Sequence, residues 1–385
     1  MTTKLRSETQ SQKSRTTLRT SLIILVFFAT SCSGAKAPGA WVAKDSGTGD
    51  SFFSVNFVDE NNGWLNGLSG RNPEPTDDNA NGNKKPKPKK QDKIEDPLQA
   101  NQGFEVLKTT DGGQTWKQIP DQFKNKIRSV WFTDTQHGWA LSIDRDILAT
   151  TDGGATWSVQ RKAGKVKLKL VGNRRQPEMD QPEQIDQLHF IDGQHGWAWG
   201  GGRKDEYAEQ PGILLTTIDG GHNWNQIAYP FDQNTSAVFF LDSDNGWAST
   251  MGASFYRTSD GGLNWTKVQT KLPEDVFRSI FFTSSNDGWV VGRSGRIART
   301  SDGGRSWRKM YEIKDQFKIQ DIFFTDHDHG WAVGDDGAIL YTSDHGDSWL
   351  DIGSPIPARF MDVRFVGKIG WAVGLGGALL KFEPK

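Results

Sequence analysis

The sequence predicts an all-β fold that is built from seven copies of one four-stranded antiparallel unit. Its 385 residues include 43 glycines and 16 tryptophans, and such an excess of turn-forming and packing residues indicates a motif that is used many times. Seven Gly-Trp pairs recur along the chain, and six Asp-x-Gly boxes are each followed by a tryptophan five residues after the aspartate. With 35% hydrophobic residues, the chain can also supply a substantial core.

Residues 277–310 show the strands of one unit. Short β-prone runs at 277–282, 289–292, 296–300 and 307–310 alternate with turns that contain glycine, serine and aspartate. Four short strands in about 42 residues form the blade of a propeller. A single blade cannot bury both faces, so the blades must stack in a ring. We therefore predict a seven-bladed β-propeller.

The count of the motifs predicts how the ring closes. The Gly-Trp pairs begin at Gly63, Gly138, Gly196, Gly246, Gly288, Gly330 and Gly370, and the boxes begin at Asp111, Asp152, Asp219, Asp260, Asp302 and Asp344. One box is therefore missing, and the chain stops soon after Trp371. Trp41 precedes Trp64 by 23 residues, just as Trp116 precedes Trp139. The N-terminal strand at Trp41 is therefore expected to close the last blade, which removes an open sheet edge.

The N-terminus has the layout of an export signal. Residues 1–31 combine a basic start, a short apolar run at 22–29 and small residues directly before Cys32, the single cysteine. This pattern predicts a lipoprotein whose Cys32 carries the lipid, with an ordinary signal peptide and an incidental cysteine as the alternative. We expect an exported, membrane-anchored protein that faces the periplasm, the thylakoid lumen or the cell exterior, with residues 32–40 as a tether and 41–385 as the propeller.

Three insertions interrupt the repeat, at residues 69–103, 161–184 and 201–211. The first is rich in Asn, Pro and Lys, which is typical of disorder. The second contains alternating apolar and basic residues, which favours a strand extension with a basic face. In a propeller all three insertions emerge on the face opposite the boxes, where they could form a binding surface or could be neutral surface loops.

The box pattern Ser/Thr-x-Asp-x-Gly-x-Ser/Thr/Asn-Trp, as at 109–116 and 300–307, resembles the Asp-box of bacterial-neuraminidase-type repeats. Together with the Gly-Trp-Ala/Val segments in seven blades and the lipoprotein signal, it resembles the photosystem II stability/assembly factor family and its broad set of bacterial relatives. This resemblance implies a non-enzymatic scaffold that binds a membrane-protein assembly intermediate through an arginine patch. The patch matches this sequence at Arg128 and Arg278.

We therefore expect the insertion-bearing face to dock an acidic partner, which could be a protein, an anionic polysaccharide or lipid headgroups. The expected contact residues are Arg128, Arg278, Arg161, Lys162, Lys165, Lys167, Lys169, Arg174 and Arg175. The formal net charge of −1 argues against nucleic acid as a partner. We expect a protein partner, a membrane contact through the lipid anchor and a monomeric chain.

The sequence supports an enzymatic function less well than a binding function. The six box aspartates, which begin the segments named above, are expected to hold their own hairpin turns rather than to catalyse. A sialidase-like or other carbohydrate-active propeller is the alternative function, and it would need clustered arginines beside a Tyr–Glu pair at the channel mouth. The cluster at 326–329 could suggest a metal site, but a solvated turn is favoured. We expect no metal and no cofactor.

Overall fold

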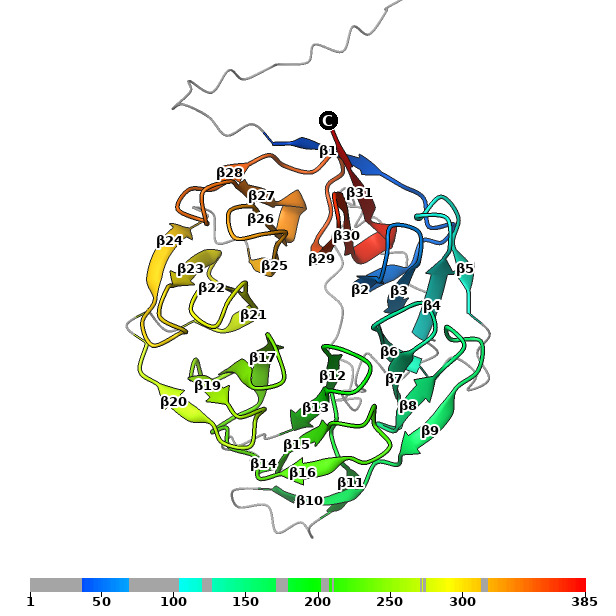
Figure 1. The fold of residues 1–385 in the computed structure, drawn as a ribbon, viewed down its shortest axis with the longest axis vertical. Coiled ribbons are helices and arrows are strands. Elements are labelled where there is room, and N and C mark those ends of the chain that lie inside the picture. The colour runs from blue at the N-terminus through cyan, green and yellow to red at the C-terminus, as the bar shows by residue number, and fades with distance from the viewer. Residues whose placement is uncertain are drawn as a thin grey trace, which may run out of the picture. The chain divides into compact units, whose positions relative to one another are not determined.

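The computed structural model describes residues 37–68, 104–119, 127–170, 179–201, 208–209, 211–270, 272, 275–312 and 318–385. Seven four-stranded antiparallel sheets surround a central axis, with the first strand of each blade innermost (Figure 1). The predicted all-β, seven-bladed propeller is therefore confirmed. None of the helices in these described ranges has the length and hydropathy that crossing a bilayer requires.

The blades follow one another along the chain, and the strands of each run in order from the inside of the ring to the outside. Blade 1 contains β2 (Ser51–Phe57), β3 (Gly63–Leu68), β4 (Phe104–Thr109) and β5 (Lys117–Gln118). Blade 2 contains β6 (Ile127–Phe132), β7 (Gly138–Ser142), β8 (Ile147–Thr150) and β9 (Ser158–Arg161). Blade 3 contains β12 (Gln187–Phe190), β13 (Gly196–Gly201), β15 (Gly212–Thr217) and β16 (Asn225–Ile227). Blade 4 contains β17 (Thr235–Phe240), β18 (Asn245–Thr250), β19 (Phe255–Ser259) and β20 (Thr266–Val268).

The remaining three blades complete the ring. Blade 5 contains β21 (Phe277–Phe282), β22 (Gly288–Gly292), β23 (Arg296–Thr300) and β24 (Arg308–Glu312). Blade 6 contains β25 (Ile319–Phe324), β26 (Gly330–Gly334), β27 (Ile339–Thr342) and β28 (Leu350–Asp351). Blade 7 contains β29 (Phe360–Val366), β30 (Ile369–Gly374), β31 (Leu379–Pro384) and β1 (Gly39–Ala43). Two short 3-10 turns, η1 (Asp335–Gly337) and η2 (Leu375–Gly377), join the second and third strands of blades 6 and 7.

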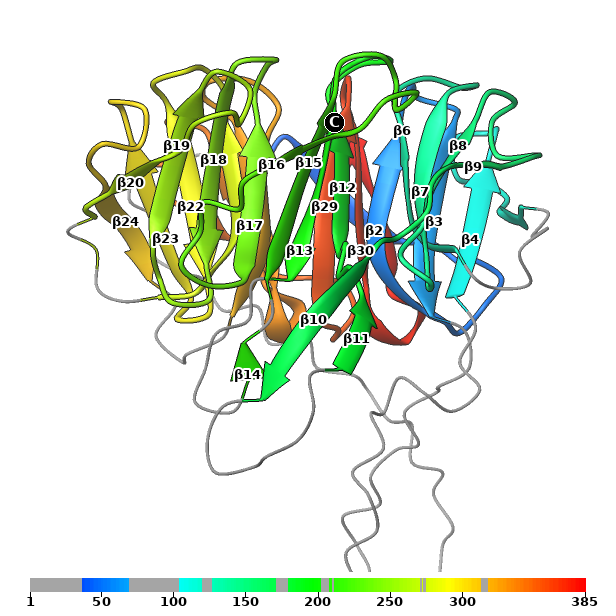
Figure 2. The same cartoon turned by 90° about the horizontal axis from the view of Figure 1, so that it is seen from below.

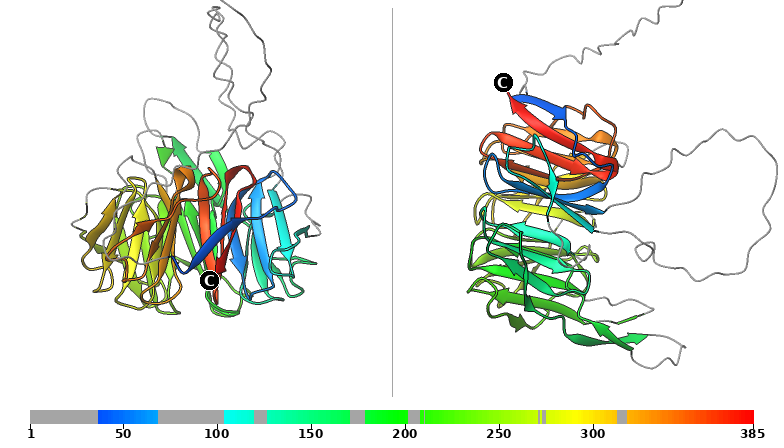
Figure 3. Two further views of the ribbon diagram at one scale, coloured as in Figure 1. Left: turned by 90° about the horizontal axis from the view of Figure 1, so that it is seen from above. Right: turned by 90° about the vertical axis from the view of Figure 1, so that its right-hand side faces the viewer.

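Blade 7 is closed by the N-terminal strand, as predicted. Strand β1 pairs antiparallel with β31, as the blue and red strands of Figure 3 show. In this ladder Trp41 lies opposite Phe382. The Trp41 ring is 7% exposed and contacts Trp331 and Phe365 in addition to Phe382, with ring centroids 5.4–5.8 Å apart. The closing strand is therefore fixed by buried aromatic packing as well as by its backbone ladder.

The Gly-Trp pairs supply the contacts between blades. A Cβ atom on Gly288 would lie 2.4 Å from the ring of Phe282 in the same blade, so a side chain at this position would clash with that ring. Trp247 of the preceding blade then stacks on Phe282, with ring centroids 3.5 Å apart. The equivalent glycine, phenylalanine and tryptophan positions repeat around the ring. Each blade surface therefore buries one aromatic pair.

The box turns add polar bonds across the same surfaces. Trp139 of blade 2 donates its indole N–H to the carbonyl of Gly220 in the box of blade 3, at 2.9 Å. Three further tryptophans make the equivalent bond to the next blade. In blade 1 the tryptophan makes no such bond, and the Lys108 ammonium instead donates to the carbonyl of Gly153 at 2.9 Å and lies over the Trp64 ring. The four indole bonds satisfy buried donors at the blade surfaces, whereas the indole nitrogen of Trp64 is buried without a hydrogen-bond partner among the described residues.

The insertions build a small accessory sheet. Strands β10 (Lys165–Leu170), β11 (Met179–Pro182) and β14 (Ala208–Glu209) form a three-stranded sheet in the order β11-β10-β14. Lys169 pairs with Glu209, so the second and third insertions are joined by a backbone ladder. The predicted strand is confirmed, but it lies in a separate sheet and does not extend a blade. Figure 2 shows this sheet at the rim opposite the β15–β16 turn.

Candidate functional site

The innermost strands carry an irregularity that aims side chains into the central channel. Six of the seven contain a β-bulge at the same position, and the register shifts across Phe53, Arg128, Ser236, Arg278, Gln320 and Met361. A bulge inserts one extra residue and re-aims its side chain. Five of these six residues line one cavity of about 760 Å³ that also borders Leu68 and Phe104, the ends of strands β3 and β4. Both strand ends flank the first insertion, which places the cavity at the insertion-bearing mouth of the channel.

Arg128 and Arg278, the two arginines that the family resemblance implied, line this same cavity. The Arg128 guanidinium lies 3.1 Å from the carboxylate of Asp186, and Arg145 approaches the same oxygen at 2.5 Å. Arg145 also donates to the carbonyl of Ile185 at 3.2 Å. One carboxylate therefore faces two guanidinium groups, which leaves this side of the mouth positively charged.

Arg278 is the least satisfied cation of the mouth. Its buried Nε atom has no hydrogen-bond partner, and the guanidinium makes no ion pair with any described residue. Burial, and then the nearby charge of Arg293, lower the pKa of Arg278 below its usual range, although an arginine side chain still stays protonated in a protein. An under-paired guanidinium of this kind would gain charge-assisted hydrogen bonds from a carboxylate that entered the cavity.

The floor of the cavity is a buried ionic cluster. Arg364 lies 2.6 Å from Asp321 and 2.9 Å from Asp362, and both carboxyl side chains are 8% exposed. Burial and the neighbouring Asp321 charge raise the pKa of Asp362 to about 8, against the opposing effect of Arg364. The raised pKa favours the protonated form of Asp362, which reduces the negative charge of the cluster. The positive charge of the mouth comes from the other three arginines.

Deeper in the channel, a ring of seven equivalent residues lines a second cavity of about 400 Å³: Asn56, Trp131, His189, Phe239, Phe281, Phe323 and Arg364. Each lies opposite the tryptophan of its blade's Gly-Trp pair. Burial, and then the charge of Arg364, lower the pKa of His189 to about 4. The imidazole is therefore neutral at physiological pH, and the ring is largely apolar and aromatic.

The basic insertion is only partly available for binding. Arg161 pairs with the buried Glu183 at 2.7 Å, and Lys162 pairs with Asp146 at 2.7 Å. Lys165 is exposed at the start of β10, the strand that also carries Lys167 and Lys169. Arg174, Arg175 and Cys32 lie outside the described residues. The structure therefore brings Arg128 and Arg278 to one cavity, while Arg161 and Lys162 are engaged in ion pairs.

The box aspartates bond within their own turns. Asp302 accepts hydrogen bonds from the Thr300 hydroxyl, the Ser306 backbone N–H and the Ser306 hydroxyl at 2.6–2.8 Å. The same three bonds recur at Asp111, Asp152, Asp219, Asp260 and Asp344, with an asparagine amide in place of the last hydroxyl in two boxes. Bonds from Thr115 lower the pKa of Asp111 to about 2, so its carboxylate stays ionised. This geometry is that of a turn-stabilising carboxylate.

Sequence reasoning missed three residues of the mouth. Arg145 lies in the turn between β7 and β8 with a positive φ of 69°, and Asp186 lies in the segment that leads into β12. Arg364 replaces the aromatic residue that most blades place in the deeper ring. Alignment of the seven blades could have found Arg364 as the one cation at its position, but no sequence signal connects Arg145 to Asp186.

The lining of both cavities bears on the chemistry that the site can perform. Four arginines line the mouth, while the described residues that line either cavity include no tyrosine and no glutamate. A carbohydrate-cleaving site of the sialidase kind requires a tyrosine nucleophile and a glutamate beside its arginines. The arrangement instead suits the binding of an anionic group at the mouth, with apolar contacts below it.

Comparison with known proteins gives consistent matches. The family model described as photosynthesis system II assembly factor YCF48 matches residues 109–230, 222–317 and 309–383. A curated relative, the photosystem II assembly lipoprotein Ycf48 of Synechococcus sp. (strain CC9902), is 24% identical over 159 residues, which span 40% of this chain and 40% of that protein. The match thus covers less than half of the relative's length.

Two solved structures share the fold. A structure of YCF48 bound to D1 peptide has a TM-score of 0.63 and 19% identity, and the alignment covers 91% of this chain and 98% of that chain. YCF48 from Cyanidioschyzon merolae has a TM-score of 0.63 and 20% identity, with 89% and 99% coverage. These identities support the fold, while the family model carries the assignment of the family.

Proposed function

The chain belongs to the photosynthesis system II assembly factor YCF48 family, and from this premise we propose that it is a non-enzymatic scaffold that docks a segment of a protein partner at the channel mouth. The observation that carries the proposal is the cavity that Arg128, Arg145 and Arg278 line together. A carboxylate from a peptide side chain or a chain terminus is the group that these guanidinium donors would bind.

The comparisons indicate where to look for the partner. A structurally similar YCF48 is bound to a D1 peptide, so we propose a peptide segment of a photosystem II subunit as the ligand of this chain. The aromatic ring below the mouth, which includes Phe281 and Phe323, would accept apolar side chains that follow the anionic group. Docking on a rigid ring requires little rearrangement of the scaffold, which reduces the entropic cost of binding.

Fluorescence polarisation with a labelled D1 peptide tests the docking site. Replacement of Arg278 by Gln should weaken binding at least about tenfold, because a charge-assisted hydrogen bond contributes about 1.5–3 kcal/mol. Arg128→Gln should have a smaller effect because Arg145 still faces the shared carboxylate of Asp186. Arg305, which donates to the Asp302 carbonyl in a box turn on the opposite face, supplies the control Arg305→Gln. Equal affinity of the Arg278→Gln and Arg305→Gln variants would refute the proposed site.

The basic insertion is the second part of the proposed surface. We propose that its exposed cations attract the acidic partner over a longer range, so they should affect the association rate more than the dissociation rate. Replacement of residues 162–176 by a Gly-Ser linker should therefore slow association at low salt, with little difference at high salt. Unchanged association at low salt would remove the insertion from the docking surface.

A non-enzymatic role is also a proposal, and it is supported by the geometry of the acidic residues. The box aspartates direct their oxygens to their own turns, as at Asp302, and neither cavity is lined by a tyrosine or glutamate in the described part of the chain. The sialidase-like alternative predicts turnover of a fluorogenic sialoside by the purified chain. Turnover that Arg278→Gln abolishes would overturn the scaffold proposal.

We also propose that the scaffold is tethered to a membrane through a lipid on Cys32. The support is the sequence pattern around Cys32 and the name of the curated relative, which is called a lipoprotein. In cells that express the full chain, the Cys32→Ser variant should lose incorporation of labelled palmitate and should leave the membrane fraction. Retention of the label by Cys32→Ser would refute lipidation at this position.

A further inference from the structure

The box of blade 6 differs from the other five at one backbone position. The residue after the box aspartate is glycine at 112, 153, 220, 261 and 303, with φ of 67–71°. In blade 6 it is His345, with φ of 62°. This left-handed region is uncommon for residues with a side chain. A Cβ atom at the five glycines would also lie 2.6–2.9 Å from a backbone oxygen of the neighbouring turn. Blade 6 therefore tolerates a side chain where the equivalent turns have none, and a strained residue of this kind often marks a functional site.

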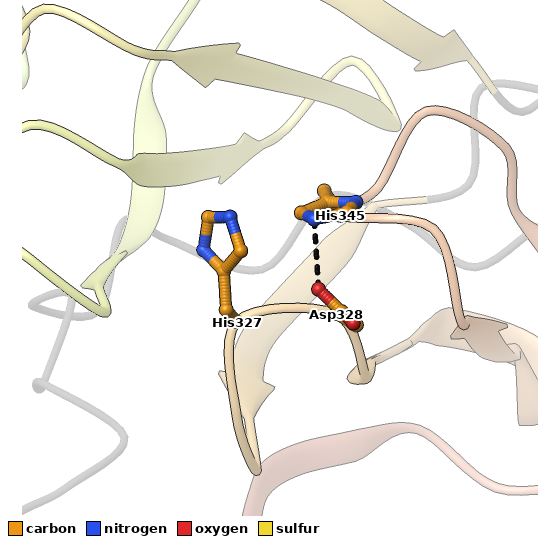
Figure 4. Close-up of side chains that lie close together, drawn as sticks. All are labelled: His327, Asp328 and His345. Atoms are coloured by element: carbon orange, nitrogen blue, oxygen red, sulfur yellow. Dashed lines mark ion pairs between the residues drawn. The ribbon is translucent and has the colours of Figure 1, made fainter.

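The side chain of His345 points to two further metal-ligand candidates. Its Nε2 atom lies 2.7 Å from a carboxylate oxygen of Asp328, and its ring centroid lies 4.4 Å from that of His327 (Figure 4). One ligand atom from each of the three residues lies within 4.8 Å of the other two. Figure 4 shows that His327 and Asp328 come from one turn and His345 from another. The two turns are joined by the backbone N–H of His345, which donates to the carbonyl of Asp328 at 3.1 Å.

The other blades do not repeat this combination. At the positions of His327 and Asp328, blade 5 has Ser285 and Asn286, and its box has Gly303. The same backbone bond joins these two turns, from the Gly303 N–H to the Asn286 carbonyl at 2.9 Å. The scaffold of the two turns is therefore common to the blades, and three coordinating side chains have been added to it in blade 6.

We propose that His327, Asp328 and His345 bind a divalent first-row transition-metal ion, with zinc as the reference ion. The two imidazoles are borderline ligands, which favour zinc, copper or nickel over magnesium and calcium, and a carboxylate also coordinates zinc. Zinc–ligand bonds of about 2.0–2.2 Å place tetrahedral ligand atoms about 3.4 Å apart. The His345 Nε2 atom and the Asp328 carboxylate oxygen, which lie 2.7 Å apart, would therefore separate slightly, and the exposed His327 would turn toward them. His327 also lines a hollow of about 480 Å³ between blades 5 and 6.

The site is independent of the proposed docking mouth. It belongs to the box-bearing face, since two box-side turns build it, whereas the arginines lie at the insertion-bearing mouth. With three protein ligands, the ion would keep at least one position for water or for a ligand from another molecule. The simpler alternative is an ion pair between His345 and Asp328 that needs no metal. A metal-binding experiment distinguishes the two alternatives, because only the proposed site predicts stoichiometric zinc binding.

Isothermal titration of the EDTA-treated full chain with zinc chloride tests the proposal, provided that the chain carries no polyhistidine tag. We expect one zinc ion per chain, no binding of calcium, and a tetrahedral absorption spectrum when cobalt replaces zinc. His345→Gly and His327→Ser install residues that other blades carry at these positions, so the fold should be kept. Each variant should weaken zinc binding at least about tenfold, because it removes a direct ligand.

His137 provides the matched control. It pairs with Asp134 at 2.8 Å in the equivalent turn of blade 2, and asparagine occupies its position in blades 1 and 4, at Asn62 and Asn245. The His137→Asn variant should bind zinc as the parent chain does. Absence of stoichiometric zinc binding in the parent chain, or equal binding by His345→Gly and the parent, would overturn the proposal.

Discussion

Replacement of Trp41 by alanine should open the ring at one seam. The Trp41 ring is 7% exposed and lies against Trp331, Phe365 and Phe382. Burial of a tryptophan removes about 200 Å² from water, which is worth about 5 kcal/mol at about 25 cal/mol per Å². Residual burial in the unfolded chain lowers this value, and the indole nitrogen of Trp41 is buried without a partner. We therefore expect a loss of about 3–4 kcal/mol in the free energy of unfolding.

Denaturant unfolding of the full chain gives this free energy, and hydrogen exchange shows where the structure opens. In the Trp41→Ala variant, exchange should accelerate first in β31, because β1 is its outer partner. Trp349 is the matched control, because it is 8% exposed after the box of blade 6, within a blade made of consecutive strands. The Trp349→Ala variant should lose similar stability without selective exposure of β31. A loss below about 1 kcal/mol, or equal acceleration in all blades, would refute the closure argument.

Three further substitutions test other parts of the fold. Gly288→Ala should cost about 1–3 kcal/mol in unfolding free energy, because its Cβ atom would meet the Phe282 ring at 2.4 Å. His189→Phe should stabilise the chain by about 2 kcal/mol at pH 4.5 relative to pH 7. The reason is that burial and Arg364 lower the pKa of His189 in the folded chain to about 4. As the pH falls below about 6.5, this histidine therefore binds a proton in the unfolded chain before it does so in the folded chain, which destabilises the fold. Asp302→Ala should cost about 1 kcal/mol, because the turn loses its hydrogen-bond acceptor.

Each of these substitutions has a control or a contrary outcome that can be measured by thermal or denaturant unfolding. A Cβ atom at Gly193 would have no neighbouring atom within 4 Å, so Gly193→Ala should change stability by less than about 0.5 kcal/mol. If the free energy of unfolding fell with decreasing pH in His189→Phe just as it does in the parent chain, the assignment of a neutral, buried imidazole would be contradicted. Asp302→Asn keeps one acceptor oxygen and should lose less stability than Asp302→Ala, and the reverse order would contradict the turn role.

The architecture could be predicted from the sequence because the repeat positions have one physical role each. Gly288 is glycine because a ring of its own blade covers it, and Trp247 is tryptophan because it must reach the next blade. The same packing requirements recur in every blade, so the same residue types recur at regular spacing in the sequence. The role of Trp41 in ring closure was predicted because Trp41 precedes Trp64 by 23 residues, the same spacing that separates Trp116 from Trp139. Its place opposite Phe382 confirms the prediction.

The site could be predicted only in part, because it depends on departures from the repeat. Arg128 and Arg278 were matched through the family resemblance, but the bulges that aim them into one cavity follow from backbone register. The bond between Arg145 and Asp186 joins blades 2 and 3 and has no fixed sequence spacing. The pairing of Lys169 with Glu209 likewise joins two insertions whose contact no local pattern encodes.

Ring closure has a consequence for the biosynthesis of the protein. Lys44 and Glu383, which pair at 2.8 Å beside the closing ladder, are 339 residues apart in the chain. Strand β1 is synthesised long before its partner β31, so the two strands can pair only after β31 has been made. A chain that stops short of β31, or is clipped there, would present two lone edges to quality-control proteases. Closure of the ring therefore depends on a contact between two segments that are far apart in the chain and cannot form before β31 has been synthesised.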